Sequence, residues 1–167
     1  SAGRSSEQAF AYYVLYSMFD ERPQWALDYI RRYWGEQMRS CLFNGAWHEA
    51  WDIEHFKTDL LSTSHAWCSG PTALLPQKVL GVEPASAGWK TFTVRPEPCD
   101  LEWARGVVPS PLGPIDIEWE RGKSGVFKLR VRVPQGSSAE LFVPGTDPAR
   151  LTINGKAIDK CPGITAV

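Results

Sequence analysis

The spacing of apolar residues changes once along this chain, near residue 85, and that change constrains the fold more than any other feature. Before it, apolar residues recur every three to four positions, as they do on one face of a helix. After it, they alternate with polar residues in short runs bounded by Gly and Pro, which is typical of strands with one face in water. The sequence therefore predicts an α+β chain in two parts, helices over residues 1–85 and an antiparallel β-sandwich over residues 86–167.

The first part is expected to hold four short helices. They are predicted over residues 7–19, 23–35 and 36–41, and from about residue 65 or 70 to residue 81. Pro23 suits the first turn of a helix, and Gly35 and Gly81 are typical of helix ends. The short connection between the first two helices predicts an antiparallel helical hairpin.

The second part is expected to hold six or seven short strands. They are predicted over residues 92–95, 101–104, 115–119, 127–133, 139–143, 151–153 and 156–158. Asn154-Gly155 joins the last two and is the strongest hairpin signal in the chain. Of the tryptophans here, Trp103 and Trp119 are expected to pack inside the sandwich because they sit in alternating strands.

Charge and cysteine spacing exclude several classes of function. The chain has 18 basic and 19 acidic side chains, so no basic surface suits a nucleic acid. Its apolar stretches are far shorter than the roughly 20 residues that cross a bilayer. Cys41, Cys68, Cys99 and Cys161 are too dispersed for zinc ligation, so we expect no metal, no cofactor and no membrane or nucleic-acid partner. The cellular compartment stays open.

Residues that can carry chemistry are concentrated in the first part, which contains all three His and five of the eight Trp. The densest clusters are residues 44–52 and 62–71. Between them they supply Trp47, His48, Glu49, Trp51, Asp52, His65 and Trp67. Indole faces stack on the C–H face of a sugar, and neighbouring carboxylates can act as acid or base on a glycosidic bond. The alternative is that these tryptophans only pack in the core.

Several motifs in order resemble glycoside hydrolase family 78, the α-L-rhamnosidases. They are Tyr33-Trp-Gly-Glu-Gln-Met38, Trp47-His-Glu-Ala-Trp-Asp52, Ser64-His-Ala-Trp-Cys-Ser-Gly-Pro-Thr72 and Val79-Leu-Gly-Val82. Residues 88–96 and 100–106 are similar to the opening strands of that family's C-terminal β-sandwich. The resemblance covers roughly residues 5–145 and implies the C-terminal part of such an enzyme.

The resemblance implies a fold and a mechanism. Residues 1–85 would be the last helices of an (α/α)6 catalytic barrel, and residues 86–167 its C-terminal β-sandwich domain. The family removes terminal α-L-rhamnose with inversion, using a general acid and a general base. The base motif falls on Glu49, whereas no motif for the acid is found in this sequence, so the chain alone is expected to be inactive.

The same resemblance assigns substrate-binding roles to Trp47, Trp51, His65 and Trp67. One position departs from the family pattern, because His48 stands where the residue before the glutamate is more usually Trp. The expected partners are a rhamnosylated carbohydrate or glycoside and the remainder of the parent chain.

Two other interpretations stay open. The chain could be a non-catalytic carbohydrate-binding module that uses exposed tryptophans of the sandwich, such as Trp89, Trp103 or Trp119. It could also be a purely structural β-sandwich fragment.

Overall fold

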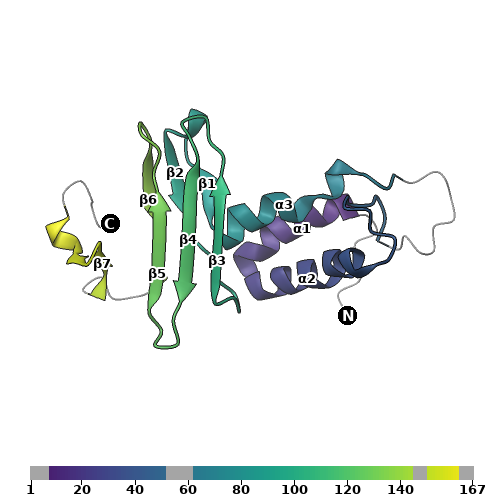
Figure 1. The fold of residues 1–167 in the computed structure, drawn as a ribbon, viewed down its shortest axis with the longest axis horizontal. Helices are drawn as coiled ribbons and strands as arrows, with labels where there is room; N and C mark the ends of the chain where they lie inside the picture. Colours follow the sequence, from purple (N-terminus) through teal and green to yellow (C-terminus); the bar gives the residue numbers. More distant parts are fainter. Residues whose placement is uncertain (1–7, 52–61, 145–149, 162–167) are drawn as a thin grey trace.

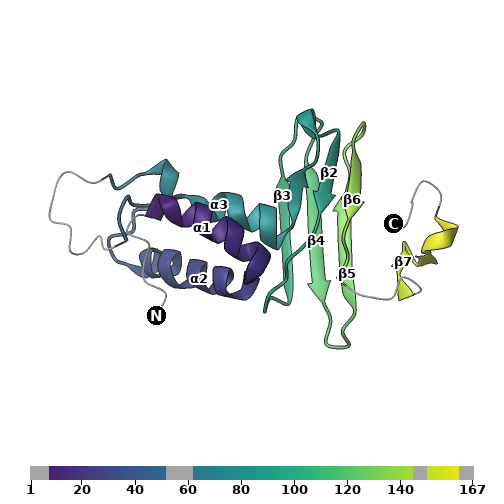
Figure 2. The same ribbon diagram turned by 180° about the vertical axis from the view of Figure 1, so that it is seen from behind.

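The computed structural model describes residues 8–51, 62–144 and 150–161 of the 167-residue chain. Its helices gather at one end of the molecule and its strands at the other, so the two parts lie side by side along the longest axis (Figure 1). The same division is clear from behind, where α3 runs from the helical end toward strand β3 (Figure 2).

The first two helices are α1 (Gln8–Glu21) and α2 (Pro23–Arg39), separated only by Arg22. Pro23 begins α2 as predicted, but the helix does not end at Gly35, and a separate helix over residues 36–41 is wrong. One continuous helix runs through Gly35 because its buried face extends to Tyr33, Trp34 and Gln37. That burial outweighs the roughly 1 kcal/mol that glycine costs inside a helix.

The predicted fourth helix consists of three short turns. They are η1 (Ala66–Cys68), α3 (Gly70–Leu74) and the wider π-helical turn η2 (Leu75–Val79). The backbone N–H of Leu80 donates to the oxygen of Leu75 at 3.0 Å, which closes the wide turn. The predicted stop at Gly81 is confirmed: its φ is +79°, and a Cβ there would lie 2.1 Å from the Arg95 carbonyl.

The strands form two three-stranded sheets and one hairpin. One sheet has the order β1 (Val82–Pro84), β2 (Thr91–Val94), β6 (Ser138–Leu141), and the other β3 (Trp103–Val108), β4 (Ile115–Arg121), β5 (Phe127–Arg132). A short 3-10 turn, η3 (Ala87–Trp89), lies between β1 and β2. Another, η5 (Ile158–Lys160), lies near the end of the described residues. The sheets share a buried apolar cluster to which Phe92 and Val94 of β2 and Ile115 and Ile117 of β4 belong. Two packed sheets follow the helices, as the α+β prediction requires.

One strand pair differs from the expected antiparallel arrangement. β2 and β6 are parallel, with Thr91 opposite Ser138 and Val94 opposite Leu141. Alternation within a strand identifies its two faces but not the direction of its neighbour, so the sequence pattern does not reveal this pairing. Strand β1 was not predicted either, because it is only three residues long and ends in Pro84.

The hairpin at Asn154-Gly155 is confirmed. It joins β7 (Thr152–Ile153) to β8 (Lys156–Ala157), and both turn residues have positive φ, +51° and +76°. That combination is the one a two-residue hairpin turn of type I′ requires.

The two tryptophans that were expected inside the sandwich differ in solvent exposure. Trp119 is fully buried, as predicted, whereas Trp103 is 60% exposed, so its predicted burial is wrong. The register explains the difference: Trp119 lies opposite Ala104, so the adjacent Trp103 necessarily faces the other side of the sheet.

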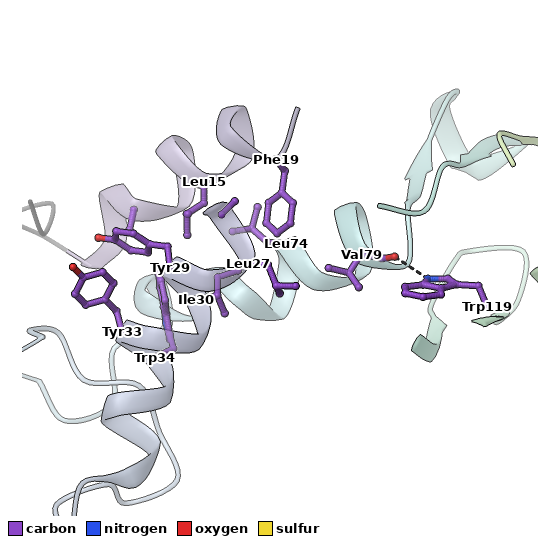
Figure 3. Packing of buried hydrophobic residues seen from close by; sticks show 12 residues of the cluster. Leu15, Phe19, Leu27, Tyr29, Ile30, Tyr33, Trp34, Leu74, Val79 and Trp119 are labelled. Atoms are coloured by element: carbon purple, nitrogen blue, oxygen red, sulfur yellow. Dashed lines mark hydrogen bonds between the residues drawn. The ribbon is translucent and has the colours of Figure 1, made fainter. Parts of the chain in front are cut away.

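The core of the helical part continues into the sheets. Trp119 of β4 packs in the same cluster as Leu27, Leu74 and Val79, and its Nε1–H donates to the Val79 carbonyl at 2.9 Å (Figure 3). A second tie lies at the surface, where Arg31 of α2 contacts Asp100 at 2.7 Å and lowers the pKa of that carboxyl through a hydrogen bond. The helices and the sheets therefore share one packed junction.

The proposed division near residue 85 stays a prediction. β1 lies on its N-terminal side yet pairs with β2 on its C-terminal side. Across the described residues, the helices are all too short or too polar to cross a membrane.

Candidate functional site

Two loop segments, residues 44–51 and 62–68, come together at the helical end of the molecule. The backbone N–H of Glu49 donates to the Ser62 carbonyl at 2.9 Å, and that of His65 donates to the Trp47 carbonyl at 2.8 Å. These two bonds hold the segments side by side. The structure thereby brings together Glu49 and His65, which are 16 positions apart in the sequence.

The Glu49 carboxylate is fixed but open to solvent. Its Oε2 accepts the backbone N–H of Ser62 at 2.9 Å and lies 3.9 Å from Nδ1 of His65. The side chains of Glu49 and His65 are 38% and 30% exposed, respectively. A carboxylate held in this way can accept a proton from a group that arrives from solvent, and the imidazole beside it can bond to a hydroxyl.

The three tryptophans assigned to substrate binding differ in exposure. Trp67 is 61% exposed and lies in η1, the turn that begins directly after His65. Trp47 is half-buried, with its ring 5.5 Å from that of Phe43. Trp51 packs edge-on against Trp34 at 4.7 Å, among the aromatic side chains of α2. The geometry available for stacking on a ligand is therefore clearest at Trp67.

His48, the residue that departs from the family pattern, faces inward. It is 4% exposed and stacks on the Phe43 ring at 6.5 Å. Among the described residues its Nε2 has no hydrogen-bond partner. The His48 side chain is therefore buried beneath the loop, whereas the neighbouring Glu49 side chain faces solvent. Asp52 falls outside the described residues.

A buried polar cluster beneath these loops was not found from the sequence. Gln8 of α1 and Gln37 of α2 are 1% and 3% exposed, and Nε2 of Gln37 donates at 2.9 Å both to Oε1 of Gln8 and to the Ala50 carbonyl. In the alternative orientation of its amide, Gln8 donates to the His48 carbonyl at 2.7 Å. The glutamine pair thus bonds to backbone beside Glu49, to Ala50 in one orientation of the Gln8 amide and to His48 in the other.

The second loop segment is held from the same side. Nε1 of Trp34 donates to the Cys68 carbonyl at 2.9 Å, and Sγ of Cys68 lies 3.8 Å from the Glu49 carbonyl. Burying a polar side chain costs free energy unless it forms a hydrogen bond. The bonds to the loop carbonyls therefore explain why polar side chains are buried at this position. Nothing in the local pattern around Gln8 or Gln37 signals this contact, because 29 residues separate them.

The two loop segments present three kinds of side chain that can contact a ligand. Within residues 8–51, 62–144 and 150–161, no three His, Cys, Asp or Glu side chains are grouped so as to hold a metal ion. The groups that the loops do present are a carboxylate, an imidazole and an exposed indole, which match the stacking surface and the proton acceptor that sugar chemistry uses.

Comparison with known proteins finds similarity to one family of enzymes. Residues 81–157 match the model of the bacterial alpha-L-rhamnosidase C-terminal domain. The alpha-L-rhamnosidase of Streptomyces avermitilis is 32% identical over 74 residues, which are 44% of this chain and 7% of that protein. The alpha-L-rhamnosidase of Alteromonas sp. is 34% identical over 91 residues, 53% of this chain and 10% of that protein. The chain thus spans a tenth or less of these relatives.

Solved structures extend the similarity into the helices. The crystal structure of the family 78 rhamnosidase of Bacillus sp. GL1 is 31% identical with a TM-score of 0.69, over 82% of this chain and 15% of that one. The structure of the Streptomyces avermitilis alpha-L-rhamnosidase complexed with L-rhamnose is 28% identical with a TM-score of 0.56, over 62% of this chain and 10% of that one. Residues 81–157 therefore match the bacterial α-L-rhamnosidase C-terminal domain, and the comparisons together support a C-terminal fragment of an α-L-rhamnosidase.

Proposed function

We propose that this chain supplies one half of the active site of an inverting α-L-rhamnosidase and that Glu49 is its general base. The observation that carries the proposal is the placement of the Glu49 carboxylate: it is anchored by the Ser62 N–H, lies 3.9 Å from His65 and is open to solvent. The similarity to named rhamnosidases supports the substrate class, a glycoside that ends in α-L-rhamnose.

In the proposed reaction, Glu49 takes a proton from a water molecule as the water oxygen bonds to the anomeric carbon. The glycosidic C–O bond breaks, and its electron pair leaves with the aglycone oxygen, which is protonated by a general acid. The products are the aglycone alcohol and rhamnose with inverted anomeric configuration. An inverting pair stands about 6.5–9.5 Å apart so that water fits between base and sugar.

The neighbouring side chains would hold the sugar. Trp67 offers a stacking face for the ring, and His65 is placed to bond a sugar hydroxyl close to Glu49. Trp47 and Trp51 would act mainly from beneath, because they pack against Phe43 and Trp34. His65→Ala should therefore weaken both rhamnose binding and turnover.

The general acid would come from the remainder of the parent chain. One face of α1 fits contact with that remainder, since Phe10, Tyr13 and Val14 are 55%, 56% and 47% exposed at helical spacing. Losing the acid typically costs about 100- to 10,000-fold in rate, and lost positioning of the sugar costs more. The 167-residue chain alone should therefore be inactive.

The test is Glu49→Gln in the full-length enzyme on an aryl α-L-rhamnoside, with Glu140→Gln on β6 as the matched control. We expect kcat to fall by at least about 100-fold while rhamnose still binds, because the amide keeps the shape but cannot take a proton. The control should keep its rate. Unchanged kcat in Glu49→Gln, or parent-like activity of the 167-residue chain, would refute the proposal.

A further inference from the structure

The outward face of the β3–β4–β5 sheet is ordered into three cross-strand rows. The pairing register sets the rows, and each contains one side chain from every strand. They are Trp103–Glu120–Lys128, Arg105–Glu118–Arg130 and Val107–Asp116–Arg132. Side chains opposite one another on a sheet face are close enough to interact, so each row acts as a unit.

The charges in these rows do not cancel. Each basic residue of β5 forms an ion pair with the carboxylate opposite it on β4: Lys128 with Glu120, Arg130 with Glu118 at 2.8 Å, and Arg132 with Asp116 at 3.3 Å. Arg105 is the exception, because the described residues give it no ion pair. The middle row, with two guanidinium groups around the single carboxylate of Glu118, therefore carries a surplus positive charge.

An exposed indole stands beside that surplus charge. Trp103 is 60% exposed, and the Arg105 guanidinium carbon lies 5.7 Å from the centre of its ring. The fully buried Trp119 fills the sheet's inner face, so Trp103 is not needed for that core. The aromatic face and the uncompensated guanidinium are thus presented together.

The same face is hollowed. A depression of about 640 Å³ is lined by Arg105, Val107, Asp116 and Arg130, among others, and an adjoining one of about 430 Å³ is lined by Trp103, Arg105, Glu118 and Glu120. Arg105 and Glu118 line both. Oδ2 of Asp116 is buried and accepts no hydrogen bond from the described residues, since the Arg132 nitrogen at 3.3 Å is not aligned to donate.

We propose that this face binds an acidic glycan through a uronic acid residue, whose ring stacks on Trp103 and whose carboxylate pairs with Arg105. A sugar ring presents C–H groups to the indole, and a guanidinium matches a carboxylate with two parallel hydrogen bonds. Glu118, which lines both depressions, then accepts a hydrogen bond from a sugar hydroxyl. The three carboxylates of this face are each paired with a base of β5, which leaves the single positive charge of Arg105, so one ligand carboxylate at this contact is the charge that fits.

This site is separate from the one proposed around Glu49. It lies on the sheets rather than the helical loops, so it would bring a polysaccharide chain to the enzyme instead of reacting with it. Because Trp103 and Arg105 are exposed, their replacement should leave folding intact, which a thermal melt of each variant checks.

The test is a titration of the 167-residue chain with trigalacturonate, followed by two-dimensional NMR of backbone amides and indole N–H groups. The matched probe is the methyl ester of the same trisaccharide, which keeps the rings and removes the negative charges. We expect the acid to shift signals of β3, β4 and β5, to bind about tenfold more tightly than its ester, and to lose affinity as salt is raised.

Variants locate the site. Arg105→Gln should weaken binding of the acid about tenfold and bring it to the level of the ester, and Trp103→Ala should weaken both probes several-fold. Arg32→Gln on α2, Glu49→Gln, and Trp67→Ala, which removes an indole of equal exposure on the helical part, should leave the affinity unchanged. Absence of binding, equal affinity for acid and ester, or loss in Trp67→Ala instead of Trp103→Ala would overturn the proposal. Because Glu49→Gln is expected to leave the affinity for the acid unchanged, the binding experiment tests the sheet site independently of the catalytic role of Glu49.

Discussion

The outward surfaces of α1 and of the β3–β4–β5 sheet differ in what they show to solvent. On α1, Ala11, Leu15 and Phe19 are buried, yet Phe10, Tyr13 and Val14 on another side are also apolar and exposed. On β4 the inward residues are apolar and the outward ones are acidic and paired with bases of β5. The sheet presents paired charges to solvent, whereas α1 presents apolar side chains on both its buried and its exposed sides. If the proposed contact of α1 with the remainder of the parent chain is right, the two surfaces should respond differently to substitution.

Despite that contrast, the helical part and the sheets share one core. Substitution of Trp119 tests whether this shared core couples their stability. We expect Trp119→Ala to lower the free energy of unfolding by about 3–5 kcal/mol, since it opens a cavity and leaves the Val79 carbonyl without its donor. Denaturant unfolding followed by far-UV circular dichroism would measure this. Trp103→Ala on the opposite face of the same sheet is the control, with a change within about 0.5 kcal/mol.

If the helices and sheets were energetically independent, only one of two unfolding transitions would move in Trp119→Ala. A single transition that shifts as a whole is what the shared junction predicts.

Within the helical part, the glutamine pair offers a second test of how the loops are held. Gln37→Leu removes the donor to the Ala50 carbonyl and the partner of Gln8, so we expect a loss of about 1–3 kcal/mol in unfolding free energy. Hydrogen exchange of the Glu49 amide should also become faster, because the loop loses an anchor. Gln24→Leu, which removes only an exposed bond to Asp28, is the control. Equal effects of the two substitutions would show that the buried pair does not anchor the loop.

The contrast between the two surfaces predicts how the isolated chain associates. Replacing Phe10, Tyr13 and Val14 together by Gln should reduce self-association and hydrophobic-dye binding, with little change in stability because these side chains are about half exposed. Sedimentation velocity over a range of concentrations would measure it. Replacing Lys128, Arg130 and Arg132 of β5 by Gln should leave association unchanged. If the unsubstituted 167-residue chain were monomeric and bound no dye, that result would contradict the proposed role of the α1 face.

Several features of the fold could be predicted from the sequence, and each prediction that failed did so for an identifiable physical reason. Gly81 and Asn154-Gly155 were predictable because their backbone angles suit few other residues. The exposure of Trp103 was not, since burial depends on the register between β3 and β4, which puts Ala104 rather than Trp103 beside the core with Trp119.

For the candidate site, the sequence singles out residues but does not reveal what holds them in place. The motif resemblance singles out Glu49 and His65, whereas the two backbone bonds that bring their segments together leave no periodic signature. Gln8 and Gln37 were missed for a similar reason. Glutamine is common on exposed helix faces, and only the tertiary packing of α1 against α2 buries this pair.

The most direct test of the central claim, that Glu49 is the general base, is azide rescue of Glu49→Ala in the full-length enzyme. Azide needs no base to become a nucleophile, so it should replace the activated water where the carboxylate has been removed. The account predicts that azide raises the rate of the variant and that the product is a rhamnosyl azide of inverted anomeric configuration. No rescue together with wild-type-like turnover, or an azide product of retained configuration, would contradict it.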